Sequence, residues 1–310
     1  MFATVIKNLR PYMSVAGTLT ASQTYYNNDS GRRYASITSY QSLLLLTYNN
    51  STGYVMTLDP TSGNRASVSW LGNQARGMHY NILTDKIVMV SGSNGELQTF
   101  EVTPKTKVTV STNGEYKTLR GDVSNSYVFG WKVDSDGSTN QLFRVDVDGT
   151  NEIVVSTTSL FRSNEQLDGF TLDSDNELVY FHGLTSRTLR SVSWDLTGFT
   201  THNLILQHSN GGSIEYSRGY IYYWGVEQDN PTGINSNFDR YNPSNDEIYQ
   251  INGISESIRN GVLYTPALFI DPESNRMLVS GESKFRIYVL AQTFSTTKPS
   301  CQRLENYSTA

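Results

Sequence analysis

One short sequence pattern recurs along almost the whole chain and constrains the fold more than any other feature. In each copy an apolar run ends at a polar anchor residue, and about seven positions later comes the middle of a second apolar run, often rich in Tyr. The anchors are separated by 43, 41, 51, 42 and 56 positions. A repeat of roughly 40–50 residues built from short strands is typical of β-propeller blades. In chain order the anchors are Thr38, Asn81, Asp122, Asp173, Glu215 and Asp271.

Each repeat has room for four short strands. In the third unit the Asp-Gly pairs at 136–137 and 148–149 separate apolar runs, which is typical of hairpin turns because Gly supplies a positive φ. We therefore predict an all-β fold, namely a six-bladed β-propeller of four-stranded blades. In the fourth unit the predicted strands, from the channel outward, are residues 169–172, 177–183, 188–194 and 201–207.

The sixth repeat has sequence for only three strands. Its last apolar run, residues 285–291, is followed by a polar segment. Residues 15–22 alternate weakly between apolar and polar, and we expect them to pair beside 285–291, so that an N-terminal strand closes the ring and leaves no open edge. The predicted organisation is an N-terminal arm with the ring-closing strand (1–33), one six-bladed propeller (34–292) and a polar C-terminal tail (293–310).

Composition narrows the functional classes. A net charge of -5 argues against a nucleic-acid partner, which needs clustered Lys and Arg. The uninterrupted apolar runs, such as residues 43–46, are at most five residues long, so we expect no membrane insertion. Residues 1–10 lack the apolar stretch of a secretory signal. The chain is rich in Asn, Ser, Thr, Tyr and Gly and poor in Lys, a composition typical of adhesins and virion proteins.

Three segments resemble a known propeller family. Residues 142–151, Leu-Phe-Arg-Val-Asp-Val-Asp-Gly-Thr-Asn, and the apolar run 153–156 are similar to the strand-turn-strand element of six-bladed YWTD-type (LDL-receptor-like) propellers. Residues 178–181 and 220–224 resemble the strand that carries the Tyr-Trp-Thr-Asp element of that family. The resemblance implies the fold and a ligand-binding face, and it implies no chemistry.

A long polar stretch in the fifth unit, residues 226–237, is the first candidate binding site. It contains Pro231 and Gly233, and long loops on a rigid scaffold often carry function. We expect Phe238 and Tyr241, which follow it, to be loop aromatics. The predicted binding residues are Tyr223, Trp224, Asp229, Asn230, Asn235, Phe238 and Tyr241.

The acidic anchors allow two interpretations. The first is structural: the anchors bond backbone amides between blades. The second is a cation, with Ca²⁺ the candidate, at the central channel, because hard cations prefer clustered carboxylate oxygens. We favour the structural role and expect no cofactor. The predicted structural anchors are Asn81, Asp122, Asp173, Glu215 and Asp271, and the predicted metal ligands are Asp122, Asp173 and Asp271.

Asp122 also ends the integrin-recognition tripeptide Arg120-Gly121-Asp122. Host attachment through this tripeptide requires an exposed loop tip. The position of Asp122 within the repeat favours a structural role instead.

Recognised catalytic motifs do not occur in this sequence. The histidines are His79, His182, His202 and His208, none of them in a zinc-ligand spacing, and there is no G-x-S-x-G elbow or P-loop. We expect His79 and His182 to lie on inner strands. This lack of catalytic motifs predicts a protein that is not an enzyme.

The predicted function is therefore non-enzymatic. We expect a virus or phage surface protein, in a spike, capsid or tail, whose loops contact neighbouring subunits or a host receptor or glycan. The alternatives are a secreted or cell-surface carbohydrate-binding or adhesion module, and a metal-dependent propeller hydrolase.

Overall fold

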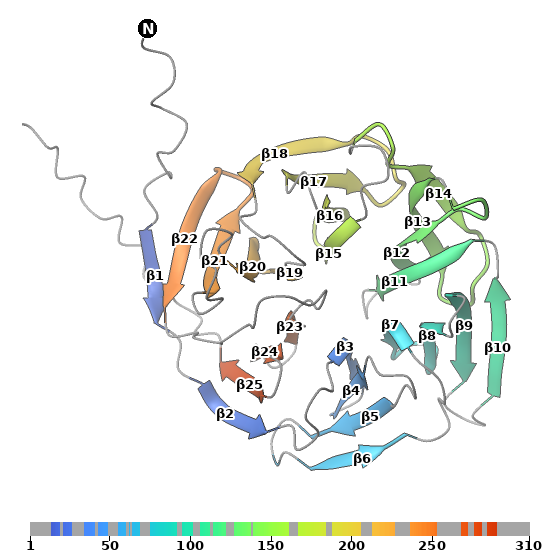
Figure 1. Cartoon of the computed structure of the whole chain (residues 1–310), viewed down its shortest axis with the longest axis horizontal. Coiled ribbons are helices and arrows are strands. Elements are labelled where there is room, and N and C mark those ends of the chain that lie inside the picture. The colour runs from blue at the N-terminus through green and yellow to red at the C-terminus, as the bar shows by residue number, and fades with distance from the viewer. Residues whose placement is uncertain are drawn as a thin grey trace, which may run out of the picture.

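Strands and turns account for the secondary structure of the residues that the computed structural model describes (Figure 1). None of these residues forms a helix long and apolar enough to cross a membrane. The described residues are 14–18, 21–26, 34–40, 43–48, 55–59, 62, 64–68, 75–91, 95–101, 106–111, 114–121, 127–137, 139–160, 167–183, 188–205, 213–226, 236–252, 268–271, 276–280 and 284–289.

Within the described part of the chain, the strands form six sheets arranged as a ring, five with four strands and one with five (Figure 1). We number these sheets as blades one to six in the chain order of their innermost strands. Blades one to three, listed from the channel outward, are β3 (Tyr34–Tyr40), β4 (Leu43–Tyr48), β5 (Val55–Leu58) and β6 (Arg65–Ser67); β7 (Ala75–Asn81), β8 (Lys86–Ser91), β9 (Glu96–Glu101) and β10 (Thr106–Ser111); and β11 (Glu115–Gly121), β12 (Tyr127–Val133), β13 (Asn140–Asp146) and β14 (Ile153–Ser156).

Blades four to six follow the same design, and their outermost members include the first two strands of the chain. They are β15 (Leu167–Asp173), β16 (Leu178–Gly183), β17 (Thr188–Ser193) and β18 (Thr200–Ile205); β19 (Ser213–Ser217), β20 (Tyr220–Val226), β21 (Ser236–Asn242), β22 (Glu247–Asn252) and β1 (Ser14–Thr18); and β23 (Leu268–Asp271), β24 (Arg276–Ser280), β25 (Lys284–Val289) and β2 (Ala21–Tyr26). The predicted fold class, an all-β propeller of four-stranded blades, is confirmed.

An N-terminal strand closes the ring, as predicted, but the strand differs from the predicted one. β2 (21–26) pairs antiparallel with β25 and completes blade six. The first half of the predicted segment, residues 15–18, instead belongs to β1, which pairs in parallel with β22 as the fifth strand of blade five. The N-terminal segment thus gives one strand to each of two neighbouring blades, and both pairings satisfy edge N–H and C=O groups that would otherwise be open.

Apolar side chains on both faces of each sheet hold the blades together. In β8 all four residues from Ile87 to Val90 are buried, which is the pattern of a strand covered on both faces. One cluster joins blades three and four through Phe129 and Trp131 on one side and Phe181 and Trp194 on the other. The Phe129 and Trp194 rings have centroids 5.3 Å apart. The aromatic side chains of this cluster therefore fill the seam between blades three and four.

The inner strands of neighbouring blades approach very closely at one glycine. A Cβ atom built on Gly77 of β7 would lie 2.4 Å from the backbone nitrogen of Leu119 and 2.9 Å from Thr118 Oγ1, both in β11. The backbone of β11 is fixed by its own ladder with β12. The approach of blades two and three therefore requires a residue without a side chain at position 77.

We predict that Gly77→Ala lowers the free energy of unfolding by about 2 kcal/mol or more, because overpacking against backbone cannot relax. Chemical denaturation measures this change. Gly137→Ala is the matched control: nothing lies within 4 Å of its Cβ position, and its φ of 77° adds only the strain of the left-handed region, about 1 kcal/mol. An equal loss in the two variants contradicts the close-approach argument.

A histidine lies in the seam between blades four and five. His202 Nε2 is 2.8 Å from Ser191 Oγ, and its ring centroid is 5.3 Å from that of Tyr180 and 6.3 Å from that of Tyr241. Burial lowers the pKa of His202, and the negative charge of Asp246 opposes this shift in part. The folded protein therefore holds the neutral imidazole more strongly than the unfolded chain does.

This lowered pKa predicts a pH-dependent stability. Below the unfolded pKa of about 6.5 the unfolded chain binds the proton more readily than the folded protein. The stabilisation from neutral His202 is present above that pH and is lost as the pH falls through the folded pKa. Urea denaturation between pH 5 and 8 should show a smaller slope against pH for His202→Gln than for the wild type. An identical slope for both proteins would assign the pH dependence to other groups.

Candidate binding site at the channel mouth

A cavity of about 370 Å³ opens at one end of the central channel. All six innermost strands contribute to its wall, together with the turns after β15 and β19. Each blade places one inner-strand side chain at the same level. These channel residues are Thr38, His79, Arg120, Thr171, Glu215 and Phe269.

A shared irregularity in the inner strands explains why these residues are equivalent. In blades one to four the pairing register of the inner strand shifts by one residue near its start, between 34 and 36, 75 and 77, 116 and 118, and 167 and 169. Counted from this bulge, four residues occupy the same position in their blades: Thr38, His79, Arg120 and Thr171. The structure therefore corrects the anchor series: Thr38 is equivalent to His79, not to Asn81, and it faces the channel.

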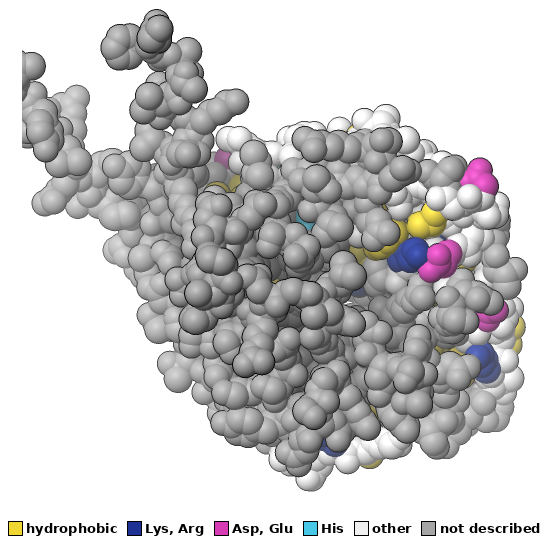
Figure 2. All heavy atoms as spheres, in the orientation of Figure 1, with side chains coloured by type: hydrophobic (Ala, Val, Ile, Leu, Met, Phe, Trp, Pro, Cys, Tyr) yellow, Lys and Arg dark blue, Asp and Glu magenta, His cyan; other side chains and the backbone are white. Residues whose placement is uncertain are grey.

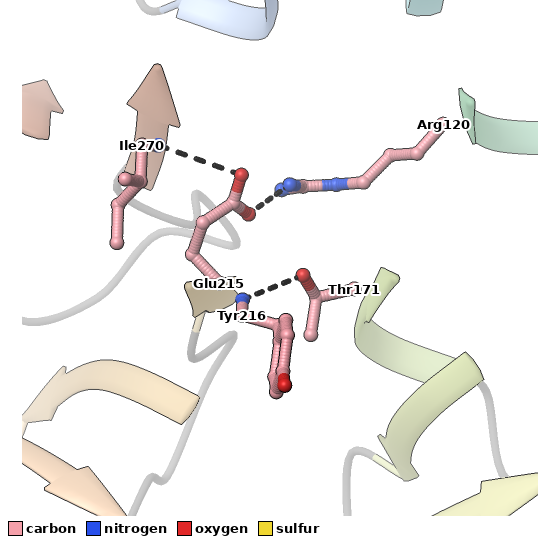
Figure 3. Close-up of polar contacts among 5 residues, drawn as sticks. All are labelled: Arg120, Thr171, Glu215, Tyr216 and Ile270. Carbon is pink, nitrogen blue, oxygen red and sulfur yellow. Dashed lines mark hydrogen bonds and ion pairs between the residues drawn. The ribbon is translucent and has the colours of Figure 1, made fainter. Parts of the chain in front are cut away.

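The central interaction of the site is an ion pair that spans the channel (Figure 3). Arg120 reaches from β11, and its Nη1 donates to Glu215 Oε2 on β19, so the pair connects blades three and five. The other carboxylate oxygen, Oε1, accepts a hydrogen bond of 3.5 Å from the backbone N–H of Ile270 in blade six. The guanidinium carbon lies 5.9 Å from the centroid of the Phe170 ring in blade four. One pair of side chains thus touches four blades.

The two partners differ in their exposure. The Glu215 side chain is 8% exposed, whereas 29% of the Arg120 side chain is exposed. Burial raises the pKa of Glu215, and the charge and hydrogen bond of Arg120, with the Ile270 N–H, act in the opposite direction. The carboxylate therefore depends on Arg120 to stay ionised, because an unpaired buried charge is strongly unfavourable.

Threonine hydroxyls at the channel positions join the backbone of consecutive blades. Thr171 Oγ1 accepts a hydrogen bond of 2.8 Å from the N–H of Tyr216, and Thr38 Oγ1 accepts one of 3.4 Å from the N–H of Tyr80. The predicted bonding of backbone amides between blades therefore occurs at the channel residues. Glu215, which bonds Ile270 N–H, is the predicted anchor seen in this role.

Asn81 and Asp173 each accept hydrogen bonds from backbone N–H groups of the turn in their own blade, and for both residues bonding to the backbone amides of a neighbouring blade stays a prediction. Asn81 Oδ1 accepts from the N–H groups of Leu83 and Thr84 at 2.9 and 3.1 Å. Asp173 Oδ1 accepts from Asn176 N–H at 3.1 Å. Each side chain closes the turn between the first and second strands of its blade, as Asx turns do. Both residues are 1% exposed.

The predicted calcium ligands are only partly placed. Asp173 Oδ2 accepts from Asn176 Nδ2 at 2.8 Å, and Asp173 also takes a hydrogen bond from the Tyr216 side chain. Asp122 and the side chain of Asp271 lie outside the described residues. Among the residues described, no group of three or more His, Cys, Asp or Glu side chains is arranged to hold a metal ion. The three-carboxylate site remains a prediction.

The predicted fifth-blade binding residues also need correction. Phe238 and Tyr241, expected in a loop, lie in β21 with 1% and 0% of their surface exposed, because the strand already begins at Ser236. Tyr223 is buried in β20. None of these three rings offers an open face to a ligand. Trp224 belongs to β20 but its side chain lies outside the described part of the chain, as do Asp229, Asn230 and Asn235.

The tripeptide at 120–122 does not present Arg120 at a loop tip. Arg120 and Gly121 end strand β11 and line the cavity. A Cβ on Gly121 would lie 2.4 Å from His79 Cδ2, so the glycine makes room for the buried imidazole. His182, expected on an inner strand, lies instead on β16, the second strand of its blade.

Two comparisons with known proteins by sequence give no match. No protein-family model matches the chain, and no curated protein matches its sequence. Solved structures, by contrast, share the fold. The chain resembles a structure of the nidogen/laminin complex with 8% identity and a TM-score of 0.56, over 72% of this chain and 81% of the other. It resembles a gluconolactonase from Xanthomonas campestris with 9% identity and a TM-score of 0.62, over 88% of this chain and 94% of the other. Both likenesses concern the propeller fold alone.

We predict that Arg120→Met lowers the free energy of unfolding by about 3 kcal/mol, because it leaves the Glu215 carboxylate buried without its cation. Glu215→Gln should cost less, since the amide can still accept from Ile270 N–H. Added to Arg120→Met, the Gln substitution should restore part of the loss. Chemical denaturation of the four proteins of this double-mutant cycle gives the coupling energy.

Lys86→Met is the control for the cycle. It removes the ion pair with Glu101, whose N–O distance is 3.6 Å and whose side chains are 31% and 47% exposed. An exposed pair of this kind contributes about 1 kcal/mol or less. Additive effects of the Arg120 and Glu215 substitutions would show that the channel pair contributes no coupling.

Proposed function

We propose that the chain is a non-enzymatic structural and binding propeller of YWTD-like design on the surface of a virus or phage particle, where it contacts neighbouring subunits or a host receptor. The observation that carries the structural part is the double bracing of the ring. β2 closes it at the circumference, and the Arg120–Glu215 pair crosses it at the channel. Such a ring is a rigid platform for loops, which suits recognition more than large conformational change.

The outer surface supports a role in an assembly. All three residues of β6 are exposed, as are the first four of β10. Val108, Ile153 and Val154 on the outer strands β10 and β14 are 52%, 39% and 43% exposed. On the face drawn in Figure 2, basic and acidic side chains of the described residues lie near one another at the rim. Mixed charge and exposed apolar residues favour protein or glycan partners over nucleic acid.

The predicted outcome is co-sedimentation with a particle. Material from the native source should be separated on a sucrose gradient, and its fractions should be analysed by peptide mass spectrometry. Peptides of this chain should peak with the particle proteins and stay there after a wash at high salt. Sedimentation as a single free chain would overturn the particle role and favour the alternative of a secreted or cell-surface adhesion module.

A propeller hydrolase is the second candidate. One observation favours it: the fold likeness to the gluconolactonase covers 88% of this chain, and the cavity lies on the central channel. Lactone hydrolysis by the purified protein, lost on addition of a chelator and in Asp173→Asn, would support this candidate over the non-enzymatic role.

A further inference from the structure

The channel mouth has the size and composition of a small-molecule site. Its volume of about 370 Å³ falls in the range of roughly 300–1,000 Å³ that ligand pockets occupy. Five of the six channel residues are polar, and Phe269 is the apolar exception. Ser174, in the turn after β15, and Ser217, at the end of β19, add further hydroxyls. Polar side chains therefore converge on one cavity from five of the six blades.

Arg120 lies at the cavity, is partly exposed and can bind a carboxylate. A guanidinium has five N–H donors in a planar fork. Glu215 Oε2 accepts from Nη1, while 29% of the Arg120 side chain remains exposed at the cavity. Both oxygens of Glu215 are engaged, by Arg120 and by Ile270 N–H. A second carboxylate can therefore approach the guanidinium without displacing the first.

The remaining wall is suited to hydroxyl groups. Thr171 Oγ1 accepts from Tyr216 N–H, so its own O–H proton is available to donate toward the channel. Ser174 and Ser217 can each donate and accept. Phe269 supplies a ring against which the C–H face of a sugar can pack.

The charges of the described wall disfavour a ligand with several negative charges. Besides the Arg120–Glu215 pair, the charged side chains among the described lining residues are Arg218 and Asp175, which carry opposite signs. A polyanion would meet two carboxylates in this wall. A neutral sugar would leave the exposed part of the Arg120 guanidinium without a charged partner.

We propose that the cavity binds a sugar acid, a small polyhydroxylated molecule with one carboxylate, and that Arg120 receives the carboxylate. This inference rests on the binding role proposed above and names the ligand class for that role. A charged hydrogen bond to a carboxylate contributes enough that its loss weakens binding by roughly tenfold or more.

Isothermal titration calorimetry with D-glucuronate tests the proposal. The neutral probe D-glucuronamide has the same size and hydroxyl groups. D-glucuronate should bind saturably, and D-glucuronamide about tenfold more weakly or worse. Arg120→Lys keeps the charge but loses the planar fork, so it should weaken D-glucuronate binding by about tenfold while leaving D-glucuronamide unchanged. Arg65→Lys, on the exposed outer strand β6, is the matched control and should bind as the wild type does.

Glu215→Gln separates a binding role from a purely structural one. This substitution removes the negative charge next to Arg120 and should tighten D-glucuronate binding severalfold. If Arg120→Lys does not fold, Ser217→Ala and the comparison of the two probes on the wild type still decide the question. Equal affinity for the two probes, or no saturable binding of D-glucuronate, overturns the sugar-acid proposal. Either result leaves the particle role untouched, because sedimentation tests that role independently.

Discussion

The pairing of β2 with β25 is the constraint on which the rest of the molecule depends. A propeller blade buries both faces only when it has a neighbour on each side, so the ring must close for every seam to form. Blade six contributes three strands from the C-terminal part of the chain and takes its fourth from residues 21–26. The two ends of the repeat are thereby joined by a backbone ladder. The fold of every blade is coupled to contacts between residues far apart in the sequence.

Two kinds of interaction stabilise the ring: apolar packing between blades, and hydrogen bonds between blades at the channel. Large rings such as Phe129, Phe181 and Trp194 fill the seams, where burial of apolar area stabilises the fold without fixing direction. At the axis, Thr38, Thr171 and Glu215 accept hydrogen bonds from backbone N–H groups of the next blade. These bonds set the height of one blade relative to the next, because a hydrogen bond tolerates little displacement.

At the channel, one residue takes part both in the stability of the ring and in the proposed ligand site. The Arg120–Glu215 pair stabilises the ring only while both charges are present, since burial raises the pKa of Glu215 and Arg120 opposes that shift. The same guanidinium is partly exposed at the cavity. A ligand that bonds Arg120 would therefore act on the interaction that braces blades three and five. We expect ligand binding and stability of the ring to be linked through this one side chain.

The amino-acid sequence by itself determined the repeat, the strand content and the need for an N-terminal strand in blade six. These follow from local patterns, namely the alternation of apolar residues, the Asp-Gly turns and the spacing of about 40–50 residues. Only the tertiary structure decided which residues meet at the axis. A bulge in the inner strands shifts the register by one residue, so Thr38 aligns with His79 and not with Asn81. The equal spacing of 41 between Thr38, His79 and Arg120 was present in the sequence.

Tertiary contacts also determined that the aromatic residues after the polar stretch of the fifth unit are buried. Phe238 and Tyr241 follow a polar stretch with Pro and Gly, and local composition cannot show that β21 begins before them. The burial of Tyr241 depends on blade four, whose Tyr180 and Leu189 share a cluster with it. The ion pair of Arg120 with Glu215 joins residues 95 positions apart. Such contacts arise from the packing of one blade against another, which no local pattern encodes.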